Sequence, residues 1–228
     1  MTPRPMSSTL HRPDGAGIFI TVEGPDGSGK STQLDLLVAW LRTRGRTVVL
    51  TREPGGTPAG EAIRAILLDP KRHAALADET ELFLFAAGRA QHVRECVLPA
   101  LCRGAIVIAS RYADATEAYQ GFGRGLSLEL VQQVNAAATG GIMPDLTIIL
   151  DINTEEGLRR ARATDKETPC GEMDRIEAAG IAFHQRVRDG YLTIARREPA
   201  RCVVIDGAAP IDIVAQAIRA CVTQRFGL

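Results

Sequence analysis

Two hydrophobic patterns alternate along the chain from Ile18 to its C-terminal end. Short, continuously apolar runs are typical of strands buried on both faces, whereas apolar residues that recur every three or four positions predict amphipathic helices. The expected strands are 18–22, 47–50, 105–109, 146–150 and 202–205. The expected helices lie around 34–41, 59–68, 79–102, 128–138 and 183–194, with two more that start near 154 and 211. Between 110 and 127 the pattern predicts only a glycine-rich loop.

Strands of this kind, separated by helices, predict a doubly wound α/β fold with a five-stranded parallel sheet and helices on both faces. A chain of 228 residues can fill one core, so residues 18–228 are expected to form a single domain. Residues 1–17 hold three prolines and no apolar run, and we expect a flexible leader there. In such sheets ligands bind at the carboxyl ends of the strands.

Composition narrows the class of protein. The formal net charge is zero, which gives no general case for a nucleic-acid surface. No apolar stretch of about 18 residues is present, so no membrane span is expected. The five cysteines form no Cys-x-x-Cys pair, which disfavours a disulfide scaffold or a zinc site and favours reduced thiols in a cytoplasm.

A phosphate-binding motif follows the first expected strand. The sequence Gly-Pro-Asp-Gly-Ser-Gly-Lys-Ser at 24–31 matches G-x-x-x-x-G-K-[ST] and opens a helix, as in P-loop NTPases. Backbone N–H groups and the helix N-terminus would hold phosphate oxygens, and the chance alternative is an ordinary glycine-rich turn. The expected ATP-binding residues are Gly24, Pro25, Asp26, Gly27, Ser28, Gly29, Lys30, Ser31 and Thr32.

Three side chains of this loop have expected roles. Lys30 should reach the β- and γ-phosphates of ATP, and the Ser31 hydroxyl should ligate Mg²⁺. Asp26 stands among phosphates, so it is expected either to hold Mg²⁺ through water or to accept a hydrogen bond from a hydroxyl of the acceptor nucleotide. The alternative is a solvated turn aspartate.

Two arginines, Arg52 and Arg111, follow the second and third expected strands. Both project from the sheet edge that carries the P-loop, and a guanidinium binds phosphate through two parallel hydrogen bonds. Together they predict a monophosphate site, although either alone is more often a surface ion pair.

A third arginine, Arg89, lies in the apolar stripe of the helix at 79–102, one turn after Phe85. A buried arginine needs a partner, so one reading is an ion pair with a carboxylate. The other is a base site, in which Phe85 stacks on a ring and Arg89 donates to its exocyclic oxygen. Because a guanidinium only donates, that site would accept O4 of thymine or uracil and disfavour the amino group of cytosine.

The chain resembles the bacterial thymidylate kinases, from about Ile18 to its C-terminal end. The resemblance rests on five segments beyond the P-loop: Thr51-Arg52-Glu53-Pro54-Gly55-Gly56-Thr57, Phe85-x-x-x-Arg89, Ala118-Tyr119-Gln120-Gly121 with Arg124, Pro144-Asp145-Leu146, and Asp174-Arg175-Ile176-Glu177. It implies phosphorylation of dTMP to dTDP with ATP and Mg²⁺, by a homodimer. Kinases for UMP or CMP, and a non-catalytic switch ATPase, are the alternatives, and no Asn-Lys-x-Asp guanine motif is present.

The resemblance also implies residue roles. Arg52 and Arg111 would grip the monophosphate, and Phe85 and Arg89 would read the thymine. Tyr119 would pack against the deoxyribose, while Thr116 and Gln120 lie where family members contact N3 and O2.

A lid over ATP is expected at about 159–175, where the resemblance favours Arg160 and Arg162 over Arg159 as the arginines that act on the transferring phosphoryl group. On a helix, however, Arg159 and Arg162 share a face and Arg160 points about 100° away.

One departure is Ser110, which stands where most family members have an aspartate. Asp151, at another strand end, either compensates or only marks the end of its strand.

Overall fold

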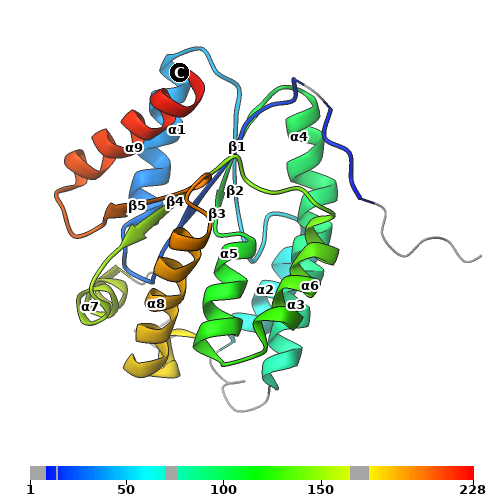
Figure 1. Ribbon diagram of the computed structural model, residues 1–228, viewed down its shortest axis with the longest axis vertical. Coiled ribbons are helices and arrows are strands. Elements are labelled where there is room, and N and C mark those ends of the chain that lie inside the picture. Colours follow the sequence, from blue (N-terminus) through cyan, green and yellow to red (C-terminus); the bar gives the residue numbers. More distant parts are fainter. Residues whose placement is uncertain (1–8, 14, 70–75, 165–174) are drawn as a thin grey trace, which may run out of the picture.

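The computed structural model describes residues 9–13, 15–69, 76–164 and 175–228. A five-stranded sheet with the order β2-β3-β1-β4-β5 lies at its centre, and all of its neighbouring strands pair in parallel (Figure 1). The strands are β1 (Phe19–Glu23), β2 (Val48–Arg52), β3 (Ile106–Ser110), β4 (Leu146–Asp151) and β5 (Cys202–Asp206). The predicted fold class is confirmed.

Helices cover both faces of this sheet (Figure 1). On one face, α1 (Lys30–Thr43) and α9 (Ile211–Phe226) pack on a core cluster that includes Ile20 and Ile148. The other face carries two clusters, one beneath α4 and one beneath α8. The remaining helical segments are α2 (Pro58–Leu68), α3 (Asp78–His92), η2 (Val93–Val97), α4 (Leu98–Cys102), α5 (Ala113–Thr116), η3 (Glu117–Gly123), α6 (Leu128–Thr139), α7 (Thr154–Thr164), η5 (Glu177–Ala179) and α8 (Ile181–Arg197).

The alternation of side chains along β1 explains how one strand serves both layers. Ile20 and Val22 lie in the α1/α9 cluster, and Phe19 lies in the cluster beneath α4. All five residues of β1 are buried, and three of them are apolar, as expected for a strand covered on both faces. No helix within the described ranges is long and apolar enough to cross a bilayer.

The prediction of a loop over 110–127 was wrong, because α5 and the π-helical η3 occupy most of it. Its glycines suggested helix breakers, but two of them permit close packing instead. A Cβ at Gly121 would stand 2.7 Å from Leu128 Cδ2, and one at Gly123 would stand 2.7 Å from Phe183 Cε2. Single π-helical turns are frequent at functional sites, and this one carries Tyr119 and Gln120.

The described part of the N-terminal segment is docked on the core. The Leu10 amide donates to the carbonyl of Gly140 at 2.8 Å, and Arg12 donates to both carboxylate oxygens of Asp145 at 2.9 and 2.8 Å. Asp145 also accepts from the backbone of Phe19, which begins β1. This anchoring differs from the flexible leader that the sequence suggested; residues 1–8 and 14 lie outside the described ranges.

We expect Arg12→Ala to lower the unfolding free energy by up to about 1 kcal/mol, because the pair is only partly buried. For a chain of this size that corresponds to a fall in Tm of about 2–4 °C. Thermal denaturation followed by circular dichroism would measure it, with Arg94→Ala, on the exposed surface of η2, as the control. An unchanged Tm in Arg12→Ala would show that the docked segment adds no stability.

Candidate active site

The phosphate-binding loop connects β1 to α1, and its glycines are required by the packing around them. Gly24 has φ 132°, and a Cβ there would lie 2.3 Å from the carbonyl oxygen of Leu150. Gly27 has φ 72°, and a Cβ there would lie 1.9 Å from the carbonyl oxygen of Gly157 in α7. The loop is thus held tightly between β4 and α7, with its amides at the start of α1, the arrangement that favours anions.

Lys30 folds back over this loop. Its Nζ donates to the carbonyls of Gly24 at 3.1 Å and Pro25 at 2.7 Å. Burial lowers the pKa of Lys30 to about 7, and Arg111 adds to this effect against the opposing pull of Asp26 and Glu23. A bound polyphosphate would favour the charged ammonium, so the lysine is placed to respond to the anion that it is expected to hold.

Asp26 is the centre of an ion-paired cluster. Arg111 forms an ion pair with its carboxylate, and the Tyr119 hydroxyl donates to Oδ2 at 2.9 Å. Burial alone would raise the pKa of Asp26, but Arg111 and Lys30 outweigh it and lower the pKa. The carboxylate is therefore engaged, unlike a solvated turn aspartate.

Arg111 is held in an unusual backbone conformation with φ 68°, which non-glycine residues rarely adopt. Its guanidinium lies over the Tyr119 ring at 4.8 Å and donates to the Tyr191 hydroxyl at 3.1 Å. Tyr191 in turn donates to the buried carboxyl of Glu23 at 2.9 Å. Burial, with Asp114 nearby, raises the pKa of Glu23 to about 8.

Arg52 ends β2 and pairs in register with Ser110 of β3, so it reaches the same sheet edge as Arg111. Its side chain is 47% exposed and forms an ion pair with Glu61 at 3.2 Å. Glu61 also accepts from the Gly56 amide at 2.9 Å. Arg52 therefore forms a surface ion pair, one of the two alternatives that the sequence allowed. It lies at the same end of the sheet as Arg111.

Arg89 is buried, with 1% exposure, and makes four hydrogen bonds to the protein. They reach Glu53 at 2.8 Å, Asn135 at 2.7 Å, the Tyr112 carbonyl at 3.0 Å and Thr116 at 2.9 Å. The buried ion pair that the sequence left open is therefore present, with Glu53 as the carboxylate. Nη1 donates to Asn135 alone among the described residues, so one N–H of this fixed guanidinium is left for a ligand.

Comparison with known proteins identifies the family to which the chain belongs. The family model described as thymidylate kinase matches residues 22–218. A thymidylate kinase of Desulfosudis oleivorans is 52% identical over 203 residues, covering 87% of this chain and 92% of its own, and one of Deinococcus radiodurans is 48% identical over 209 residues, covering 92% and 98%. This chain belongs to the thymidylate kinase family. The crystal structure of a thymidylate kinase from Ehrlichia chaffeensis superposes with a TM-score of 0.71 at 34% identity, covering 91% of this chain and 99% of that one.

Within this thymidylate kinase fold, α7 separates the three arginines on which the lid prediction depends. Gly157 and Ala161 face Gly27 of the P-loop, and Arg160 donates to the carbonyl of Gly207 at 3.1 Å. Gly207 itself lies beside the P-loop, because a Cβ there would stand 3.1 Å from the Ser28 carbonyl oxygen.

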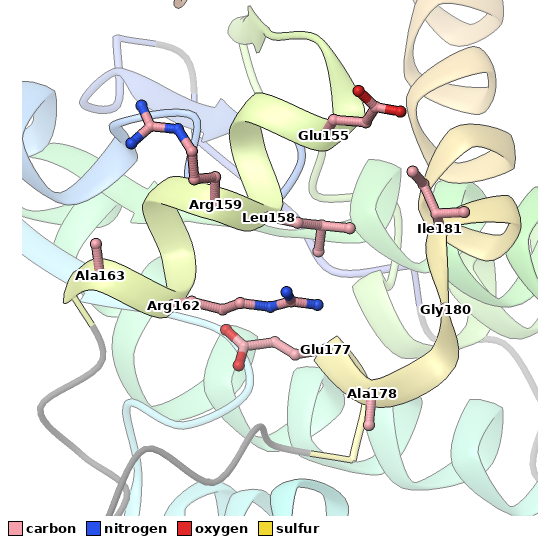
Figure 2. A pocket seen from close by; sticks show the side chains of 9 residues that line it. All are labelled: Glu155, Leu158, Arg159, Arg162, Ala163, Glu177, Ala178, Gly180 and Ile181. Carbon is pink, nitrogen blue, oxygen red and sulfur yellow. The ribbon is translucent and has the colours of Figure 1, made fainter.

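Arg159 and Arg162 share the other side of α7. They line a cleft of about 640 Å³ between this helix and the start of α8 (Figure 2). In this view Arg162 extends toward Glu177, and Arg159 projects from the turn before it. The structure therefore brings Arg160 near the P-loop and does not bring Arg162 there, although both were expected to act; residues 165–174 of the expected lid lie outside the described ranges.

We expect Arg160→Ala to lower kcat at least about tenfold, because an arginine that neutralises the transferring phosphoryl group is worth about 10³–10⁵ in comparable enzymes. Arg159→Ala and Arg162→Ala should stay within about threefold of wild type, as expected for exposed charges. Steady-state kcat at saturating ATP and dTMP compares the three single variants directly. Near-wild-type kcat in Arg160→Ala would exclude Arg160 as the catalytic arginine, and near-wild-type kcat in all three variants would exclude α7 as its source.

Four acidic or aromatic side chains that organise the site were not predicted: Glu23, Glu53, Glu81 and Tyr191. For Glu81 a signal existed, because it precedes Phe85 by four positions and Arg89 by eight on α3. The helix was already expected to contribute Phe85 and Arg89 to the base site. A carboxylate on the same buried face is therefore a candidate partner for the polar side chains of that site. The other three are revealed only by contacts between distant parts of the chain.

Proposed function

We propose that this chain transfers the γ-phosphoryl group of ATP to dTMP, giving ADP and dTDP. The observation that carries the proposal is the direct link between its two expected sites. Arg111 and Tyr119, from the expected acceptor site, both bind the P-loop residue Asp26. Donor and acceptor phosphates bound at these two places would therefore meet across one small cluster of side chains.

The proposed mechanism is positioning with charge neutralisation. Arg52 and Arg111 hold the acceptor phosphate, and Lys30 with Arg160 neutralises charge that builds on the transferring group. The acceptor phosphate is already an anionic nucleophile, so no strong general base is required. Asp26 holds Arg111 in place through Oδ1. Its other oxygen, Oδ2, which accepts from Tyr119, can also accept a hydrogen bond from a sugar hydroxyl of the acceptor.

The residues at the loop suit Mg²⁺ bound together with ATP. Ser31 is exposed at the start of α1, and Asp26 offers carboxylate oxygens nearby; both are hard ligands of the kind that Mg²⁺ prefers. Within the described ranges no three His, Cys, Asp or Glu side chains cluster as a protein metal cage. We therefore propose that Ser31 would hold Mg²⁺ directly and that Asp26 would hold it through water. Bound there, the ion would supply charge neutralisation for the transferring phosphoryl group.

Ser110 leaves this site one carboxylate short of the pattern that the family resemblance implies. Asp151 is engaged elsewhere, because Arg188 donates to both of its carboxylate oxygens at 2.7 and 2.9 Å. Glu23 is fully buried beneath the loop. We therefore propose that Asp26, the one carboxylate within the P-loop segment 24–31, is the carboxylate that serves Mg²⁺.

Phe85 and Arg89 are proposed to select the base, with Thr116 and Tyr119 completing the nucleoside site. Phe85 is partly exposed beside the buried Arg89, so a ring can stack on it within reach of the guanidinium. We also propose that the protein works as a homodimer in the cytoplasm, where its described cysteines, all free, would stay reduced. Light scattering after size-exclusion chromatography would test the dimer.

A coupled assay for ADP tests the proposal against a switch ATPase. ADP should form only when a nucleoside monophosphate is added with ATP and Mg²⁺. A switch ATPase would instead form ADP without any monophosphate, and a kinase for UMP or CMP would respond to those substrates and not to dTMP.

A further inference from the structure

Two rows of side chains face each other across the expected base site. On α3, Glu81, Phe85 and Arg89 follow at intervals of four residues and so share one face. Thr116 of α5, Gln120 of η3 and Arg124, directly after η3, follow at the same interval.

The ends of the two rows are bonded to each other. Arg89 donates to Thr116 at 2.9 Å, Gln120 Nε2 donates to Glu81 Oε1 at 2.7 Å, and Arg124 donates to Glu81 at 3.0 Å. Phe85 lies between these bonded pairs, and it alone in its row keeps part of its surface exposed. A ring stacked on Phe85 could turn one edge toward both Arg89 and Gln120, the edge on which O4 and N3–H of thymine are neighbours.

The bond to Glu81 sets the orientation of the Gln120 amide. An ionised carboxylate can only accept hydrogen bonds, so the NH₂ group of Gln120 must face it. Burial would raise the pKa of Glu81, but Arg124, with Gln120 and Arg175, outweighs it and keeps the pKa below its usual value. Arg175, itself buried, forms an ion pair with the same carboxylate. The Gln120 side chain is buried, with 1% exposure, and its Oε1 accepts no hydrogen bond from the residues that the structure describes.

We infer that Glu81 is a positioning residue for base selection: it fixes the Gln120 amide so that Oε1, a pure acceptor, is presented to the base. An acceptor pairs with the N3–H donor of thymine or uracil. It opposes the N3 lone pair of cytosine, which is an acceptor too. The base would therefore be read at N3 through Glu81 and Gln120, independently of the reading of O4 by Arg89. This inference rests on the proposed function.

The test compares kcat/KM for dTMP and dCMP in Glu81→Gln and wild type. A neutral amide at position 81 can donate as well as accept, so the Gln120 amide can turn over. We expect the dTMP preference to fall at least about tenfold, with KM for ATP unchanged. The matched control is Asp78→Asn, which removes the other carboxylate near Arg124, at 3.6 Å, without touching Gln120. Its preference should equal that of wild type.

A second variant keeps the inference testable if Glu81→Gln does not fold. Gln120→Met removes the amide but leaves Glu81 paired with Arg124 and Arg175, and it too should lose at least about tenfold in preference. The inference is overturned if a folded Glu81→Gln lowers both substrates equally, or if Gln120→Met keeps the wild-type preference. Calorimetric binding of dTMP and dCMP without ATP repeats the comparison without turnover, so a failure of the proposed phosphotransfer would be seen separately.

Discussion

Replacing Lys30 by alanine is expected to lower kcat by at least about 10²–10³, the usual effect of removing one group that stabilises charge in a transition state. The lysine is the only P-loop side chain whose positive charge can follow the phosphoryl group, and its Nζ already lies over the loop carbonyls. Since the Lys30 side chain is only half-buried, the variant should fold as wild type does. Single-turnover formation of dTDP would measure the loss in the chemical step.

The control for this variant is Arg42→Ala, which removes an exposed cation from the other end of the same helix. Its kcat should not change. If Lys30→Ala kept more than about a tenth of the wild-type kcat, the lysine could not have the role assigned to it.

The wild-type protein is expected to prefer dTMP over dCMP by up to about 10⁴ in kcat/KM, the range reached when a buried polar group loses its partner. Arg89 cannot turn away from the amino group of cytosine, because Glu53, Asn135, Tyr112 and Thr116 hold it in place. An unpaired donor would thus face a second donor in a dry site.

The uracil analogue separates this effect from simple fit. dUMP keeps O4 and N3–H and lacks only the methyl group, which is worth about 1–3 kcal/mol in a fitted pocket. It should therefore be a poorer substrate than dTMP and a far better one than dCMP. Equal kcat/KM for dCMP and dTMP would rule out Arg89 and Phe85 as the base site.

The strands and the phosphate loop could be predicted because their causes are local. A strand buried on both faces is a run of apolar residues. The P-loop needs glycines at fixed positions, and these can be recognised directly in the sequence. The loop predicted over 110–127 failed for a tertiary reason. Leu128 and Phe183 pack against Gly121 and Gly123, where a larger side chain would not fit. A sequence pattern that treats glycine as a helix breaker does not contain these contacts.

The hydrogen-bond partners of the site residues could not be predicted either, because they lie far away in the sequence. Glu53 lies 36 positions from Arg89, and the reading of that arginine as either ion pair or base reader could not be decided by periodicity. The structure shows that the two are compatible, since the ion pair fixes the guanidinium and leaves one N–H. The side of α7 that carries Arg160 was likewise set by Gly207 and the P-loop, not by α7 itself.

Phosphoryl transfer from ATP to dTMP is tested most directly by following the label of γ-³²P-ATP in the presence of Mg²⁺ and the full chain. We predict that label appears in the β-phosphate of dTDP, in amounts equal to the ADP formed, and that neither product forms when dTMP is left out. Label released as inorganic phosphate at the same rate with and without dTMP would contradict the account.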